Sequence, residues 1–464
     1  MSDFRIETDT LGEVKVPAEA YYGAQTQRAV RNFPISGVRL QPEFVRAQGI
    51  IKYAAAKANM EAGALDKKIG AAIVAASEEV ISGKLNDQFV VDVFQAGAGT
   101  SQNMNANEVI ANRATEILGG RLGEYKLVHP NDHVNMAQST NDTIHVAIHI
   151  AAVIETRGRL CPAIENLQGS LELKAKEFDH IIKCGRTHLQ DAVPIRLGQE
   201  FSGYAAMIAN DRKRIEYALD GLKELVIGGT AVGTGLNAPK GYKKSVIRYI
   251  NETSGHDFRS ADNMFEAMQS FDAVVFYAGA LRSLITSLKK VADDIRLLGS
   301  GPLTGFNELQ LPAVQPGSSI MPGKVNPVMA EMLNMICSHA MGNDACIVHA
   351  AQGGQLELNV MMPVIAYNLI QEIQILAGGM NAFADNCIKG LKANEEICRQ
   401  YAEKSTALAT ALNPIIGYHR AAKLAHQAFK ENRTVRELAL EQKVADKTAL
   451  DKALDLRRMT ESPE

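Results

Sequence analysis

The most informative stretch of this sequence is a polar segment, residues 317–327, which reads Gly-Ser-Ser-Ile-Met-Pro-Gly-Lys-Val-Asn-Pro. It combines two adjacent hydroxyl groups with Lys324 and Asn326 between glycines and prolines. Asn326 and Pro327 are residue types that favour the N-cap and the first position of a helix. Helix starts offer unpaired N–H groups to anions, so the segment predicts a loop that holds a small anion.

Three further polar segments share this design, because each precedes a stretch with the character of a helix. They are residues 97–103, 139–142 and 185–188, of which the last carries His188 and precedes a helix expected to begin near Pro194. Helix N-termini carry a partial positive charge, and hydroxyl and amide side chains add hydrogen-bond donors. If the four loops converge, they can hold a small dianion with Lys324 as the main formal charge. Each loop taken alone is more typical of ordinary helix capping than of a binding site.

Other ligand-binding motifs fail on spacing. The glycines of the 317–327 loop have five residues between them rather than four, and Val325 stands where a P-loop has Ser or Thr. The glycine-rich stretch 228–235 follows no clear strand, so it favours a turn over a dinucleotide site. His145 and His149 are four residues apart but lack the glutamate of a His-Glu-x-x-His site and a third ligand. We therefore predict core or interface histidines and no metal.

Composition narrows the class of protein. The 464 residues carry a net charge of −3, which gives no electrostatic footprint for nucleic acid or an anionic membrane. No apolar stretch approaches the ~20 residues of a membrane span, and the N-terminus does not read as a secretion signal. The six cysteines form no Cys-x-x-Cys pair. We expect reduced core thiols and a cytoplasmic protein.

Long helices must position these loops. Between Phe271 and Leu298 apolar residues recur every three or four positions, and this predicts a helix that starts near Ala261 and breaks at Gly299. Similar spacing predicts long helices over 142–178, with a kink at Pro162, and over 201–226 and 356–383. Helices of this length are usually buried in bundles, so we predict a mainly α protein and a homo-oligomer.

The pattern predicts three domains. Residues 1–138 mix an extended start at 5–16 with helices at 43–62, 67–81 and 103–118. Residues 139–395 contain the long-helix bundle. Residues 396–464 hold shorter helices separated by Asn-Pro and glycine, which is typical of a small helical domain.

Taken together, these motifs resemble the fumarase/aspartase superfamily, and the likeness covers nearly the whole chain. Besides 317–327, the matching segments follow the expected order: 97–107, 129–135, 139–142, 185–200, 229–238 and 300–302. The resemblance implies a mainly α fold of three domains, with a central bundle shared in a homotetramer. It also implies active sites that each combine loops from three subunits.

Within the superfamily, four segments resemble class II fumarases. They are residues 129–132, 201–204, 227–232 and 263–267. Three features favour aspartase: Ala98, the order of residue types at 100–103, and Thr140. Residues 144–146 depart from the patterns of both enzymes. We weigh 227–232 and 263–267 above Ala98, and so predict a fumarate hydratase with aspartate ammonia-lyase as the alternative. A catalytically silent structural homologue is a third reading, against which the intact set of site residues stands.

The resemblance implies reversible anti addition of water to fumarate, giving (S)-malate through an aci-carboxylate intermediate, with no cofactor and no metal. It assigns Ser318 as the base and His188 as the general acid, held by Glu331; a water activated by His188 is the alternative base. The implied substrate-binding residues are Ala98, Gly99, Thr100, Ser139, Thr140, Asn141, Thr187, Ser319, Lys324, Val325 and Asn326. A second, peripheral dicarboxylate site is implied at Lys126, His129, Pro130, Asn131 and Asp132.

Overall fold

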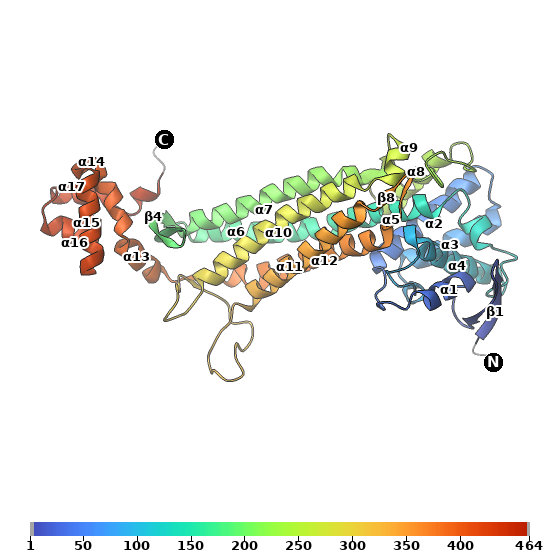
Figure 1. Cartoon of the computed structure of the whole chain (residues 1–464), viewed down its shortest axis with the longest axis horizontal. Coiled ribbons are helices and arrows are strands. Elements are labelled where there is room, and N and C mark those ends of the chain that lie inside the picture. The colour runs from blue at the N-terminus through green and yellow to red at the C-terminus, as the bar shows by residue number, and fades with distance from the viewer. Residues whose placement is uncertain (1–3, 462–464) are drawn as a thin grey trace. The chain divides into compact units, whose positions relative to one another are not determined.

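A computed structural model of the chain describes residues 4–461, and helices dominate it, as predicted (Figure 1). The chain divides into two compact units. Unit 1 comprises residues 1–162, 212–283 and 338–377, and unit 2 comprises 163–211, 284–337 and 378–464. The division into three domains stays a prediction.

Unit 1 begins with the expected extended segment. Strands β1 (Phe4–Asp9) and β2 (Gly12–Pro17) pair antiparallel, with Phe4 opposite Pro17 and Asp9 opposite Gly12. Helix α1 (Ala24–Asn32) follows and packs against the hairpin.

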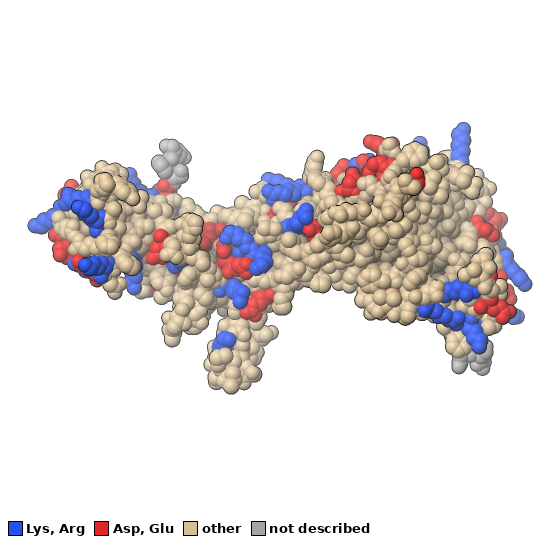
Figure 2. Space-filling view, viewed as in Figure 1, with Lys and Arg blue, Asp and Glu red and all other residues tan. Residues whose placement is uncertain are grey.

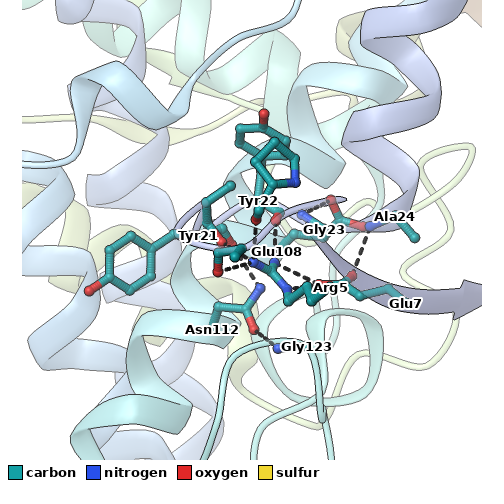
Figure 3. Close-up of polar contacts among 12 residues, drawn as sticks. Arg5, Glu7, Tyr21, Tyr22, Gly23, Ala24, Glu108, Asn112 and Gly123 are labelled. Atoms are coloured by element: carbon teal, nitrogen blue, oxygen red, sulfur yellow. Dashed lines mark hydrogen bonds and ion pairs between the residues drawn. The ribbon is translucent and has the colours of Figure 1, made fainter. Parts of the chain in front are cut away.

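The start of α1 is capped by two buried carboxylates (Figure 3). Glu108 accepts three of the four N–H groups of residues 23–26 and Glu7 accepts the fourth, at 2.9 to 3.1 Å. Arg5 donates to Glu7 at 2.8 Å and to backbone carbonyls between residues 17 and 22. The N–H groups that a helix start leaves unpaired are therefore all satisfied from within the chain.

Three helices build the core of unit 1 beside this hairpin (Figure 1). They are α2 (Pro42–Glu61), α3 (Lys67–Ile81) and α4 (Thr100–Ile117), all close to their predicted bounds. Asp66 caps α3 by accepting two backbone N–H groups, which explains the sharp start that the sequence indicated. Helix α8 (Tyr242–Ser254) packs on α2.

The predicted long helix at 142–178 forms with one irregular stretch, a π-helical turn. Helix α5 (Thr140–Glu155) passes into a wide turn at Thr156–Leu160 before α6 (Cys161–Glu177). The turn directly precedes Pro162, whose missing N–H and bulky ring disfavour regular helix at that point. The irregularity therefore falls where the proline predicts it.

Four more long helices contribute residues to both units. They are α7 (Leu197–Leu219), α10 (Asp272–Leu298), α11 (Val328–Ala351) and α12 (Met362–Asn386). The predicted break at Gly299 is confirmed, but the predicted start near Ala261 is wrong, because α9 (Met264–Gln269) is separate. Ser270 is extended between them, and its carbonyl lies 3.2 Å from His145 Nε2.

Two other predicted helices are shorter than expected. The pattern over 201–226 reaches past α7 into strand β5 (Glu224–Leu225), which pairs in parallel with β6 (Arg259–Ser260). The pattern over 356–383 begins too early, because β8 (Gly354–Gln355) and β9 (Leu358–Asn359) form a small hairpin ahead of α12.

Unit 2 contains a hairpin of β3 (Ile182–Thr187) and β4 (Gln190–Arg196), and a short pair of β7 (Leu309–Gln310) and β10 (Lys392–Ala393). Its C-terminal part carries α13 (Glu395–Lys404), α14 (Asn413–Ile416), α15 (Tyr418–Glu431), α16 (Val435–Glu441) and α17 (Lys447–Ala453). The last four helices gather around one apolar cluster.

The surface and the thiols fit the expectations from composition. All six cysteines lie within the described residues as free thiols, and five are buried while Cys346 is half-buried. Basic and acidic side chains are interspersed on the face shown in Figure 2, with no broad patch of one sign. Among residues 4–461, no helix has the combination of length and apolar character needed to cross a bilayer.

Candidate active site

The loop ahead of α4 is a tight turn with left-handed backbone. Ala98 has φ 59° and Gly99 has φ 76°, and α4 then begins at Thr100, three residues earlier than the sequence predicts. A Cβ on Gly99 would lie 3.1 Å from the side chain of Ile144 in α5. The Ala98 N–H donates to the carbonyl of Val360 at 2.8 Å. The glycine and the left-handed alanine thus let this loop pack closely on α5.

The loop ahead of α5 is a capping box. Ser139 is the N-cap, and its own N–H donates to Asp142 Oδ1 at 2.9 Å. Asp142 Oδ2 accepts the N–H groups of Gly228 and Thr230 at 3.0 and 2.9 Å. Asn141 Nδ2 donates to the carbonyl of Ala231 at 2.7 Å. The glycine-rich stretch is therefore a turn that holds this loop, in keeping with our rejection of a dinucleotide site.

Residues 144–146, which depart from the superfamily sequence pattern, do not disturb helix α5. Ile144 and Val146 are fully buried, and no break in the helix follows. His145 and His149 are buried, with ring centroids 4.6 Å apart. Burial lowers the pKa of His145 to about 4 and that of His149 to about 3. Their burial within unit 1 confirms the prediction that the two histidines are core residues.

Asn103 joins the two loops of unit 1. Its Nδ2 donates to Thr140 Oγ1 at 3.1 Å, and its Oδ1 accepts from Lys52 Nζ at 2.9 Å. Burial lowers the pKa of Lys52 to about 7, and the charge of Asp142 opposes that shift. Sequence reasoning missed Lys52, and it placed Asn103 in a polar loop without assigning it a role. The available signal was a lysine on the buried face of α2, in register with Val45 and Ala55.

The loop that carries His188 does not open a helix, and here the prediction is wrong. Thr187 ends β3 and pairs with Gln190, so His188 and Leu189 form a two-residue turn, while Pro194 lies within β4 opposite Cys184. His188 and Leu189 have φ 55° and 56°, which is the left-handed conformation that a tight hairpin turn requires. This backbone is uncommon for residues other than glycine, and Leu189 suits it less than His188, so the turn holds strained backbone beside the predicted general acid. The His188 side chain is exposed.

A buried ion network anchors that hairpin. Glu308 is fully buried and pairs with Lys183 at 2.9 Å and with Arg186 at 2.8 Å. The Arg186 guanidinium also lies over the ring of Phe306, 4.4 Å from its centroid. Sequence reasoning missed this network, because it joins residues more than a hundred positions apart.

The 317–327 loop is exposed apart from its ends, and its geometry is set by its own polar groups. Ser318 Oγ accepts the N–H groups of Ile320 and Met321 at 3.2 and 2.9 Å. A Cβ on Gly317 would lie 2.0 Å from the carbonyl oxygen of Lys324, so only glycine fits there. The loop thus holds the hydroxyl of Ser318 between two hydrogen-bond donors.

A cavity of about 640 Å³ adjoins this loop in unit 2. Lys324, Val325 and Asn326 line it together with residues from 299–313 and 390–394. Helix α11 begins one residue later than predicted, because the carbonyl of Pro327 accepts the first helical hydrogen bond, from the Glu331 N–H at 3.0 Å.

One chain brings the predicted residues together only in part. The two linked loops of unit 1 carry six of the predicted residues: Ala98, Gly99, Thr100, Ser139, Thr140 and Asn141. Ser318, Ser319, Lys324, Val325 and Asn326 share one loop of unit 2, while Thr187 and His188 lie at the hairpin tip. Within residues 4–461, no hydrogen bond or ion pair joins His188 to Glu331. The roles of these residues stay predictions.

The predicted peripheral site lies in unit 1. His129 Nδ1 accepts the N–H groups of Asn131 and Asp132 at 3.3 and 3.1 Å, so the histidine caps the turn Pro130–Val134. Lys126, Asn131 and Asp132 are exposed. Nothing in this geometry tests ligand binding, and the second site stays a prediction.

Comparison with known proteins identifies relatives along the whole chain. Residues 12–342 match the family model described as Lyase, and residues 408–461 match the one described as Fumarase C C-terminus. An aspartate ammonia-lyase from Bacillus sp is 50% identical, covering 99% of this chain and 98% of the relative. A class II fumarate hydratase from Brucella suis is 49% identical, covering 99% of each.

The fold has close solved counterparts. The crystal structure of a class II fumarase from Schistosoma mansoni superposes with a TM-score of 0.96 at 38% identity, covering 98% of this chain and 99% of that one. Both the sequence and the fold therefore point to one group of enzymes. Within that group, relatives with two different activities are equally similar in sequence to this chain.

Proposed function

Since the chain belongs to the fumarase/aspartase superfamily of lyases, we propose that it is a class II fumarate hydratase that interconverts fumarate and (S)-malate in the citric acid cycle. The observation that favours the hydratase over the ammonia-lyase is the position of the fumarase-like segment 227–232 against the loop ahead of α5. Its backbone binds Asp142 and Asn141, so it directly shapes the loop predicted to hold the substrate. EC 4.2.1.2 is the corresponding activity.

The geometry of Ser318 supports its role as the base. Removing the C3 proton of malate is the difficult step, and a serine hydroxyl does this only as an alkoxide. The two loop N–H groups that Ser318 Oγ accepts would stabilise that alkoxide. As the C–H bond breaks, charge moves onto the adjacent carboxylate, where Lys324 and the starts of α4, α5 and α11 supply fixed donors. His188 then protonates the departing hydroxyl, giving fumarate and water.

A homotetramer with shared active sites follows from the same proposal. The unit 1 loops, the His188 hairpin and the Ser318 loop are separate pieces of one chain, and copies of the chain could each contribute one. Complementation is the sharpest test. A His188→Asn variant and a Thr100→Val variant, each inactive alone, should regain activity when they are unfolded together and refolded as mixed oligomers.

The outcome of that mixing experiment is decisive for shared sites. If each site is built within one chain, mixed oligomers stay as inactive as the separate variants. Sedimentation of the wild-type protein at micromolar concentration gives the oligomeric state independently, and a monomer with full activity contradicts the proposal.

Aspartate ammonia-lyase is the second candidate, because Ala98 and Thr140, both on the unit 1 loops, lean towards aspartase and a Bacillus aspartase is equally similar. Purified protein is supplied with (S)-malate or with L-aspartate, and fumarate is followed by its ultraviolet absorbance. Turnover of malate supports the hydratase, turnover of aspartate alone supports the ammonia-lyase, and turnover of neither supports a silent homologue. We also propose a cytoplasmic location, which the six free thiols support.

A further inference from the structure

Lys52 is the most deeply buried amine in unit 1 that the proposed mechanism does not use. Its side chain in α2 is only 1% exposed. The ammonium donates to three amide oxygens, at 2.9 Å to Asn103, 3.0 Å to Asn135 and 2.9 Å to Gln138. These three bonds use all the donors that an ammonium has, which satisfies a group that would otherwise be very costly to bury.

An ammonium can only donate, so it fixes the direction of every bond around it. Asn103 must turn its oxygen to Lys52, and its Nδ2 must therefore point away. That Nδ2 donates to Thr140 Oγ1 at 3.1 Å and to Asn135 Oδ1 at 3.2 Å. The Thr140 oxygen is thus occupied as an acceptor, and its proton remains to be donated elsewhere.

From the directions of these hydrogen bonds we propose that Lys52 and Asn103 are positioning residues. They fix the hydroxyl of Thr140 as a hydrogen-bond donor to a carboxylate of the substrate. The inference deepens the proposed function and rests on it, because a dicarboxylate must occupy the loops at 97–103 and 139–142. A carboxylate only accepts, so a hydroxyl that donates binds it and a hydroxyl turned inward does not. Lys52 acts on the substrate through two intervening groups without touching it.

A structural role alone would also explain the contacts of Lys52, since they tie α2 to the segment at 135–138. Asn103→Asp separates the two roles. The aspartate keeps an oxygen towards Lys52 and gains an ion pair, so the tie remains. Its other oxygen accepts instead of donating, and the Thr140 proton turns inward to it. Loss of one hydrogen bond to a charged group corresponds to about 1.5–3 kcal/mol, or roughly a 10- to 100-fold rise in KM.

The experiment measures KM, kcat and thermal unfolding for the wild type, Asn103→Asp and Thr140→Val, and for the double variant. We expect KM for the substrate to rise roughly 10- to 100-fold in each single variant, with kcat changed less. In the double variant, Asn103→Asp should add nothing further, because its effect passes through the Thr140 hydroxyl. Thr140→Ser should restore the wild-type KM, because it restores the hydroxyl.

Asn59→Asp is the matched control. Asn59 is buried on the same helix and donates to the carbonyl of Met136 at 3.0 Å, outside the chain of bonds to Thr140. The control should lower the unfolding temperature without raising KM. If Asn103→Asp does not fold, the Thr140 pair decides: a Thr140→Val enzyme with wild-type KM overturns the inference.

Failure of the inference and failure of the proposed function give different results. A wild-type protein that neither turns over malate or aspartate nor binds fumarate in calorimetry removes the proposed function, and the inference falls with it. An active wild type whose Asn103→Asp variant keeps its KM overturns the inference alone. An equal rise in KM in Asn59→Asp also overturns it, since a loosened core would then explain both.

Discussion

The two buried histidines of α5 should make unit 1 sensitive to acid. His145 and His149 are neutral in the folded protein, because burial holds their pKa values at about 4 and about 3. In the unfolded chain a histidine has a pKa of about 6.5. Between those values the unfolded state binds more protons, so their contribution to stability is complete above pH 6.5 and is lost as pH falls towards 4.

The size of the effect follows from the shift. One pKa unit corresponds to about 1.4 kcal/mol, so moving from 6.5 to about 4 gives roughly 3 kcal/mol for His145 alone. His145 Nε2 donates to the carbonyl of Ser270, and the nearby carboxylate of Asp272 favours its charged form. Both effects are smaller than the cost of burial, so the sign is set by desolvation.

His145→Phe is the perturbation, because it keeps a ring beside Phe271, 4.7 Å away, and cannot titrate. Stability is measured by urea unfolding with far-ultraviolet circular dichroism, and by hydrogen exchange of α5 amides, between pH 7 and pH 4. The wild type should lose roughly 3 kcal/mol more than the variant over this range. His419→Phe is the control, since that histidine is exposed in unit 2.

The reasoning is refuted if the variant and the wild type lose stability in parallel as pH falls. Carboxyl groups with raised pKa values, among them Glu372 at about 9, act in the opposite direction in both proteins. They cancel in the difference between the two proteins, which is why the comparison is made between variants rather than on one curve.

Three further outcomes are expected. Ser318→Ala and His188→Asn should each lower kcat by about 100-fold or more, as expected for groups that move protons; near-wild-type rates in steady-state assays remove that residue from the mechanism. Glu108→Gln should lower the free energy of unfolding by about 1–3 kcal/mol, because an amide cannot accept all three N–H groups at the start of α1; an unchanged urea midpoint contradicts this. Glu308→Gln should destabilise by about 3–5 kcal/mol, because Arg186 keeps its charge without this carboxylate and Lys183 keeps only its pair with Glu200; a smaller loss in thermal unfolding shows that Glu200 or water compensates the two cations.

The helices could be predicted because their signals are local. The apolar spacing of α10 and the caps of α3 and α5 lie within a few residues of the elements they define. The break at Ser270 has a local signal that apolar spacing does not register, because Ser270 Oγ accepts the Asp272 N–H at 3.2 Å at the start of α10. Its contact with His145, more than a hundred residues away, could not be predicted from local patterns. Spacing alone extends a helix until a glycine or proline stops it.

The candidate site also divides into features with local sequence signals and features that depend on distant contacts. The loops that carry Thr100 and Ser318 stand out by composition, and the structure places them where the sequence predicts, at helix starts. The His188 loop was misread because Pro194 fits a helix start as well as an edge strand. Lys52 and Glu308 support the site from the core, and a single sequence offers no local pattern for partners that meet only after folding.

The carboxylates at the start of α1 have a consequence for selectivity. Every exposed helix start is a potential binding site for a dicarboxylate. A protein that acts on such ions would lose ligand to helix starts where no chemistry occurs. Glu7 and Glu108 fill this one permanently with the same chemical group that the ligand would bring. A free dianion approaching it would meet negative charge and no spare donor, so the start of α1 does not compete with the predicted substrate loops for the ligand.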